Sequence, residues 1–127
     1  MSSRDEDDRN AFLTIYQPAL NALASEPETA CAVMGGANTP WQIQDEIGSY
    51  AYLADSQALA LDDEQRDGIR RLAQGVKTLP PDAIAPENGC VRAMRHPGWA
   101  PLRKEALLLA ELLEPVFDRV EDELYDD

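Results

Sequence analysis

Apolar residues recur at spacings of three and four along the longer segments of this chain, and no segment alternates apolar and polar residues for long enough to indicate a strand. Such stripes extend along residues 5–23, 62–79 and 101–124. The clearest stripe is formed by Ile43, Ile47, Tyr50, Ala51, Ala54, Ala58 and Leu61. Each pattern predicts a helix with one apolar face. We therefore expect an all-α fold in which these faces pack together.

The ends of the expected helices carry residues that start and stop helices. Ser25–Glu28, Thr39–Gln42 and Asp62–Gln65 each predict a helix N-terminus with a capping box, and Gly35-Gly36 predicts a helix stop. The connection 78–89 contains three prolines and should be irregular, with a short helix around residues 90–95 after it. The sequence thus predicts a helical bundle of four main helices with one or two short helices.

Two prolines and the last apolar stripe indicate the shape of the long helices. Pro18 should kink or divide the first helix, and Pro115 should bend the last one. Leu108 and Leu112 widen the stripe of the last helix, so we expect this helix to be central and the most buried. At 127 residues the chain is long enough for one domain with its own core. We expect residues 1–127 to form a single domain.

The sequence also predicts where the protein works. No apolar run is long enough to cross a bilayer, and the acidic N-terminus lacks the apolar stretch of a secretory signal. Cys31 and Cys90 are far apart in the sequence, and without a secretory signal we expect free thiols in a reducing compartment rather than a bridge. Their apolar neighbours indicate that these thiols are buried. Together these features predict a cytoplasmic protein.

Negative charge is the most unusual property of the composition. The 24 acids oppose 11 bases, which gives a net charge of −13. Such a surface repels nucleic acid and anionic membranes, and it attracts basic partners. Most acids lie in residues 1–65 and 105–127, whereas residues 66–104 hold eight bases and three acids. The acidic ends, residues 1–8 and 122–127, are candidates for fraying.

The acids at the end of the last helix break a local rule, because the helix dipole disfavours each by about 0.3 to 1 kcal/mol. This end is either a frayed tail or an acidic patch that receives a basic partner. The acids concerned are Asp118, Glu121, Asp122, Glu123, Asp126 and Asp127. The exposed face of the third helix adds further acids and an aromatic residue. The candidate partner-binding residues are Asp45, Glu46, Tyr52, Asp55, Asp118, Glu121, Asp122 and Glu123.

The segment 94–104 contains the only histidine, His96, between arginines and close to Trp99. In one interpretation, an anion is bound by Arg92, Arg95, His96, Trp99 and Arg103. In the other, the segment is a structural elbow in which Trp99 packs back on the last helix, and the bases pair with neighbouring acids. We favour the elbow. We expect Trp41, which follows a proline at another helix start, to share this packing role.

No motif for catalysis, metal or cofactor binding is recognisable, so we expect no cofactor and no enzymatic activity. The leading hypothesis is a small acidic cytosolic binding protein that neutralises or regulates a basic partner protein, such as a toxin or a nucleic-acid-binding protein. Bacterial immunity proteins, antitoxins and nucleic-acid-mimic inhibitors share this profile. The alternatives are an adaptor or chaperone-like module with an apolar groove for a peptide or helix, and a small-ligand binder or enzyme that uses the basic strip around His96.

Overall fold

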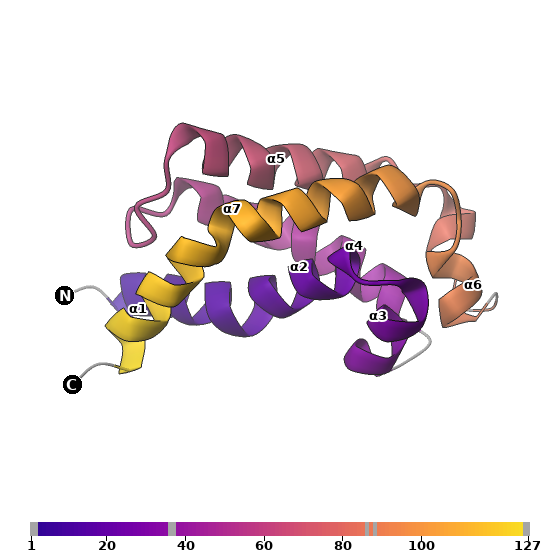
Figure 1. Ribbon diagram of the computed structural model, residues 1–127, viewed down its shortest axis with the longest axis horizontal. Helices are drawn as coiled ribbons and strands as arrows, with labels where there is room; N and C mark the ends of the chain where they lie inside the picture. The colour runs from indigo at the N-terminus through magenta and orange to yellow at the C-terminus, as the bar shows by residue number, and fades with distance from the viewer. Residues whose placement is uncertain (1–2, 36–37, 86, 88, 126–127) are drawn as a thin grey trace.

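The computed structural model describes residues 3–35, 38–85, 87 and 89–125. Its helices are α1 (Ser3–Ala11), α2 (Gln17–Ala24), α3 (Pro27–Met34), α4 (Thr39–Ser49), α5 (Asp63–Lys77), α6 (Cys90–Met94) and α7 (Trp99–Tyr125). A π-helical turn, Phe12–Tyr16, links α1 to α2, and 3₁₀-helical turns cover Tyr50–Asp55 and Pro81–Ala83. No strand occurs in the ranges described, and the predicted all-α bundle is confirmed (Figure 1).

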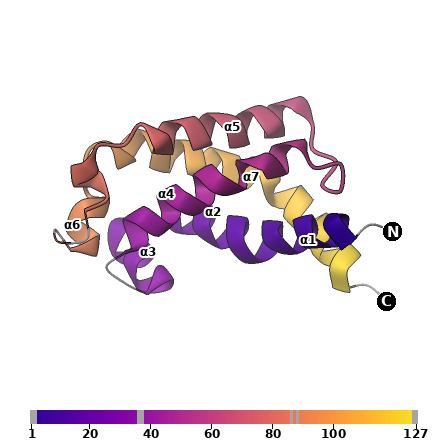
Figure 2. The same cartoon turned by 180° about the vertical axis from the view of Figure 1, so that it is seen from behind.

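Four long elements surround the core. α7 packs against α2 and α5, and α4 closes the ring by contacting both α2 and α5. α3 and α6 contact each other at one end of the bundle, while α1 and the C-terminal end of α7 lie at the other end (Figures 1 and 2). The expected bundle of long helices with additional short ones is therefore confirmed, and the last helix takes the expected central place.

The first two helices form one rod with a wide turn in its middle. Pro18 has no backbone N–H, and in a regular α-helix its ring collides with the carbonyl four residues earlier. In the structure, the N–H of Gln17 donates to the carbonyl of Phe12, five residues earlier, and the turn is π-helical. This wider turn accommodates Pro18 without ending the rod. It also buries the side chains of Phe12 and Tyr16 completely.

Pro115 lies inside α7, and Figure 1 shows this helix change direction between its orange and yellow parts. The missing N–H of Pro115 accounts for the predicted bend. The prediction that Leu108 widens the buried stripe of α7 is wrong, because Leu107 and Leu108 are 52% and 66% exposed. Three consecutive leucines cannot all face inwards on a helix, and Leu109 is the one that reaches the core. Leu112 is half-buried.

Two glycines let α5 approach α7 closely. A Cβ atom on Gly68 would lie 2.7 Å from Cδ1 of Leu109, and one on Gly75 would lie 2.4 Å from Cδ2 of Leu102. Residue numbers rise along α5 while they fall along α7 in these two contacts, so the helices are antiparallel. The contact thus repeats after one heptad on each helix, which keeps the seam on the same face of both.

Cys31 of α3 and Cys90 of α6 form a disulfide, so the prediction of two free thiols is wrong. The two cysteines are 59 residues apart in the sequence and meet only through the tertiary fold. An ion pair between Glu28 and Arg95 joins the same region. α3 is therefore held by a covalent bond and an ion pair in addition to its few buried side chains.

One of the three predicted capping boxes forms in the structure. The capping box of Asp62 and Gln65 is confirmed, with both reciprocal hydrogen bonds present. The boxes predicted at Ser25 and Thr39 are wrong. The hydroxyl of Ser25 donates instead to the carbonyl of Asn21 in the preceding helix, and Thr39 is buried in the first turn of α4. The predicted stop at Gly35 is confirmed by its left-handed φ of 84°.

The described parts of both acidic ends are helical, since α1 includes Asp5–Asp8 and α7 continues past Glu123 to Tyr125. Residues 1, 2, 126 and 127 lie outside the described residues, as does Gly36 of the predicted helix stop. None of the described helices combines the length and apolarity needed to traverse a bilayer.

Candidate partner-binding surface

Acidic residues from three separate segments meet at one end of the bundle. α1 and the last turns of α7 lie together there (Figure 1), and Arg9 forms a 3.0 Å ion pair with Glu123 across them. The 3₁₀ turn ending at Asp55 joins this group, because Oγ of Ser56 donates a 2.7 Å hydrogen bond to Asp8. We define the acidic end as residues Asp5–Asp8, Tyr52–Asp55 and Asp118–Glu123.

A hollow of about 400 Å³ lies within the acidic end, and its lining includes Arg4, Asp5, Asp8, Tyr52 and Asp55. Asp8 is buried, whereas Tyr52 is 51% exposed. Desolvation, followed by the negative charge of Asp8, raises the pKa of the Tyr52 hydroxyl above its ordinary value of 10.0. Tyr52 therefore remains a protonated hydrogen-bond donor at neutral pH, on a ring that is open to a partner.

The acids of α7 are only partly neutralised within the fold. Glu123 accepts the ion pair from Arg9 and lies 3.6 Å from Arg119. Asp118, Glu121 and Asp122 are exposed, and none of them forms an ion pair with a described residue. These three carboxylates thus present their charge to solvent from the last turns of one helix.

Two of the predicted partner-binding residues lie away from this end. Asp45 and Glu46 belong to α4, at least one turn before the 3₁₀ segment that carries Tyr52. Asp45 accepts a 3.3 Å hydrogen bond from the hydroxyl of Ser49, and Glu46 accepts one of 2.8 Å from the amide of Gln42. The structure therefore brings Tyr52 and Asp55 close to the N-terminal acids, whereas the hydrogen bonds of Asp45 and Glu46 are made within α4.

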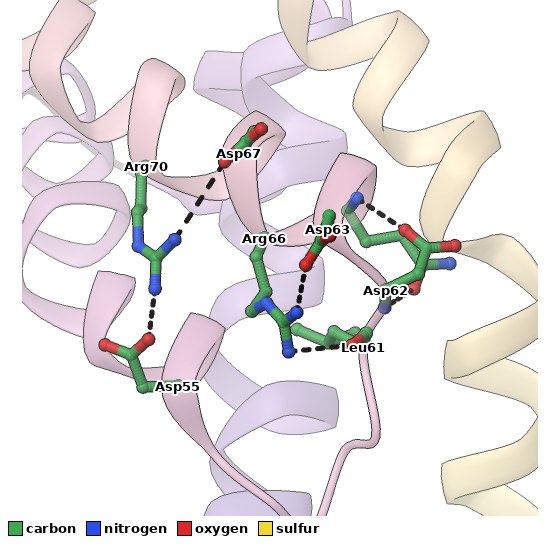
Figure 3. A network of polar contacts seen from close by, with 8 residues as sticks. Asp55, Leu61, Asp62, Asp63, Arg66, Asp67 and Arg70 are labelled. Carbon is green, nitrogen blue, oxygen red and sulfur yellow. Dashed lines mark hydrogen bonds and ion pairs between the residues drawn. The ribbon is translucent and has the colours of Figure 1, made fainter.

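Bases on α5 pair with acids close to them (Figure 3). Arg70 forms an ion pair with Asp55 and lies 3.9 Å from Asp67. Arg66 forms an ion pair with Asp63 and donates a 3.1 Å hydrogen bond to the carbonyl of Leu61. This part of the basic segment follows the interpretation in which bases pair with neighbouring acids. Other bases of the segment are exposed and form no ion pair with a described residue, namely Arg71, Lys77, Arg92 and Lys104.

The segment around His96 has the contacts of a structural elbow. Trp99 is fully buried, and its indole Nε1 donates a 2.8 Å hydrogen bond to the carbonyl of Ala83. Nδ1 of His96 accepts a 3.0 Å hydrogen bond from the N–H of Gly98. Arg103 donates to two backbone carbonyls, those of Ser25 and Met94, at 3.1 and 3.0 Å.

The candidate anion-binding residues are thus divided among different tasks. Arg95 pairs with Glu28, Arg103 ties backbone segments together, and Trp99 is closed off from solvent. His96 is half-buried. Arg92 is exposed and forms no ion pair with a residue that the structure describes. The geometry does not gather the set around one hollow.

Trp41 was missed as a functional candidate, and its predicted packing role is wrong. Its side chain is 53% exposed. It lines a mainly apolar hollow of about 580 Å³ together with residues that include Pro81, Ile84 and Ala85. Its position relative to the stripe that begins at Ile43 could have shown this, since two residues along a helix turn the side chain by about 200°.

The described residues contain no group of three or more histidines, cysteines or acids arranged to hold a metal ion. No family model, curated protein or solved structure matches this chain. The acidic end and the Trp41 hollow are both surfaces of this chain that offer a contact to a partner.

Proposed function

We propose that this protein is a small acidic binding protein that neutralises or regulates a basic partner protein by covering its functional surface. The observation that supports this most is the acidic end, where Asp118, Glu121 and Asp122 are exposed on the turns of α7 that lead to Glu123, the residue that pairs with Arg9 of α1. The net charge of −13 adds a long-range field of the same sign. A toxin or a nucleic-acid-binding protein has the basic surface that such a field attracts.

The charges act mainly on the rate of association. A strong single-sign potential raises the rate at which an oppositely charged partner arrives by about 10 to 1,000-fold, and salt screens this effect. Affinity then needs contacts that exclude water. Tyr52 supplies such a contact, because its ring is exposed beside the hollow and aromatic residues often dominate binding energy at interfaces.

The test is to capture partners from the native cells and to measure association rates with the purified partner at rising salt concentration. We expect the double variant Glu121→Gln/Asp122→Asn to slow association by about tenfold at low salt, with a smaller effect on dissociation. The matched control Glu26→Gln/Asp82→Asn makes the same change of net charge at exposed positions outside the acidic end. Equal slowing by both variants, or binding that salt does not weaken, would contradict the proposal.

A second candidate function is supported by the Trp41 hollow. An adaptor that binds a peptide or helix needs an exposed apolar groove, and Trp41 with Ile84 provides apolar surface of this kind. Binding of this type should persist at high salt and should be lost in Trp41→Ser. The third alternative, a ligand site around His96, gains no comparable support because its candidates have the separate contacts described above.

We also propose that the protein is cytoplasmic. Free thiols were one argument for a cytoplasmic location, and the disulfide between Cys31 and Cys90 removes that argument. Stable disulfides are typical of oxidising compartments. A cytoplasmic location therefore requires that the two cysteines be reduced in the cell, which alkylation of thiols before lysis, followed by mass measurement, will show directly.

A further inference from the structure

A groove with acidic walls runs between α5 and α7. Its volume is about 360 Å³, and its lining includes Glu64, Asp67, Glu105, Leu108 and Leu112. The residues of each wall follow one another at spacings of three and four, so each wall is one face of a helix. The groove therefore runs along the two antiparallel helices for about two turns, or roughly 10 Å.

Gly68 of α5 and Leu109 of α7 meet on the floor of the groove. Gly68 has no side chain, and Leu109 of α7 occupies the place where its Cβ would lie, 2.7 Å away. The neighbouring leucine, Leu108, turns outwards and is 66% exposed, so its apolar side chain is open to a partner at the groove. Apolar surface is thus available at the bottom and along one wall of the groove.

The charges of the groove point to the chemistry of an occupant. Three carboxylates and one guanidinium, that of Arg71, line it. Glu105 is half-buried and forms no ion pair or hydrogen bond with a described residue, and Glu64 is exposed without an ion pair in the same ranges. A half-buried carboxylate without a partner gains from an incoming cation more than a solvated one does.

We propose that this groove binds a basic amphipathic helix of the partner protein. The apolar stripe of that helix would lie on Leu108 and Leu112, and its lysines or arginines would reach Glu64, Asp67 and Glu105. A helix suits the groove because its apolar stripe carries flanking positions on both sides, and acids stand on both walls here. The inference deepens the proposed function and rests on it for the basic character of the partner.

A defined probe tests the groove without the native partner. The probe is a fluorescent peptide of leucine and lysine, about four helical turns long, with the leucines on one helical face. A second peptide has the same composition in scrambled order, so that its leucines do not share a face. We expect the first to bind the wild-type protein at least tenfold more tightly than the second, by fluorescence anisotropy.

Matched variants of α7 locate the binding. We expect Leu108→Ser to weaken binding of the amphipathic peptide at least tenfold and Glu105→Gln to weaken it severalfold. The control Leu107→Ser removes a similar exposed leucine from the adjacent position, which lines hollows other than this groove, and should leave binding unchanged. Equal binding of the amphipathic peptide by Leu108→Ser and wild type would overturn the proposal that the groove binds a helix. Equal binding of the scrambled peptide would also overturn it.

The acidic-end variant Glu121→Gln/Asp122→Asn separates this inference from the proposed function. If that variant alone weakens peptide binding, the peptide binds at the acidic end; the groove inference then fails while the proposed function stands. If the wild-type protein does not bind the peptide at low salt, the groove inference also fails, and the association rates with the native partner decide the proposed function separately. Thermal unfolding of each variant shows whether the fold is retained.

Discussion

Nε1 of Trp99 donates a 2.8 Å hydrogen bond to the carbonyl of Ala83, which ties the start of α7 to the 3₁₀ turn before α6. Both partners are fully buried. Replacing the indole by a smaller ring without a donor leaves a buried carbonyl unsatisfied and a cavity beside it. We expect Trp99→Phe to lower the free energy of unfolding by about 2 to 4 kcal/mol, measured by chemical denaturation.

The other tryptophan provides the control for this prediction. Trp41 is half exposed, and we expect Trp41→Phe to change the free energy of unfolding by no more than about 0.5 kcal/mol. A stability loss at Trp41 as large as that at Trp99 would show that the exposed hollow is not solvent-accessible in the native protein.

The seam between α5 and α7 leads to a second prediction. Alanine is favoured over glycine in a helix by about 1 kcal/mol, but at Gly75 its Cβ would collide with the buried side chain of Leu102. We expect Gly75→Ala to lower stability by about 1 to 2 kcal/mol despite the gain in helix propensity. The same substitution at Gly48 meets nothing nearer than 3.8 Å and should be neutral or stabilising. Urea midpoints of the two variants provide the comparison, and a stabilising Gly75→Ala would mean that Leu102 moves aside easily.

Reduction of the disulfide should be costly, because the bond closes a long loop. Cys31 and Cys90 are 59 residues apart, and the entropy of closing such a loop in the unfolded chain corresponds to about 4 kcal/mol. We expect the Cys31→Ala/Cys90→Ala variant to show a markedly lower melting temperature than the oxidised wild type. A reductant should lower the melting temperature of the wild type and leave that of the variant unchanged.

Tyr16 is fully buried, and its hydroxyl has no hydrogen-bond partner among the described residues. We expect Tyr16→Phe to be neutral or to stabilise the protein by about 1 kcal/mol, because it removes a desolvated polar group without leaving an unpaired partner. A clear loss of stability would show that the hydroxyl is in fact bonded, for instance to an internal water molecule.

Burial of Tyr16 also predicts that the free energy of unfolding depends on pH. Burial raises the pKa of Tyr16 above its ordinary value of 10.0. The unfolded chain therefore loses the phenolic proton at a lower pH than the folded chain, and the folded state loses stability as the pH rises above about 10. Tyr16→Phe should remove this contribution, so its free energy of unfolding should fall less steeply than that of the wild type in alkaline denaturation measurements.

The sequence predicted the features whose causes are local. The capping box of Asp62 and Gln65 forms within one helical turn, and the stop at Gly35 needs only a residue that tolerates positive φ. Ser25 and Thr39 carry similar signals, yet the Ser25 hydroxyl donates to the carbonyl of Asn21 and the Thr39 side chain is buried. A local signal is therefore sufficient only where its side chain neither bonds another nearby group nor is buried.

The candidate surfaces were less predictable, because they depend on how helices pack. The leucines at 107–109 extend the apolar stripe of α7, and nothing in the spacing shows which of them remains exposed. Acids at 5–8, 55 and 118–123 look like separate charge runs in the sequence, and only the fold places them at one end. The pairing of Cys31 with Cys90 depends on the tertiary fold in the same way.

The π-helical turn at Phe12–Tyr16 also determines the rotation of α1 about its own axis. Such a turn holds about one residue more than an α-helical turn, and each residue rotates an α-helix by about 100°. A chain one residue shorter at this point would turn α1 about its own axis by roughly a quarter of a revolution. Asp8 would then face away from Ser56, and Arg9 away from Glu123. The extra residue in this turn thus determines the direction in which the carboxylates of α1 point.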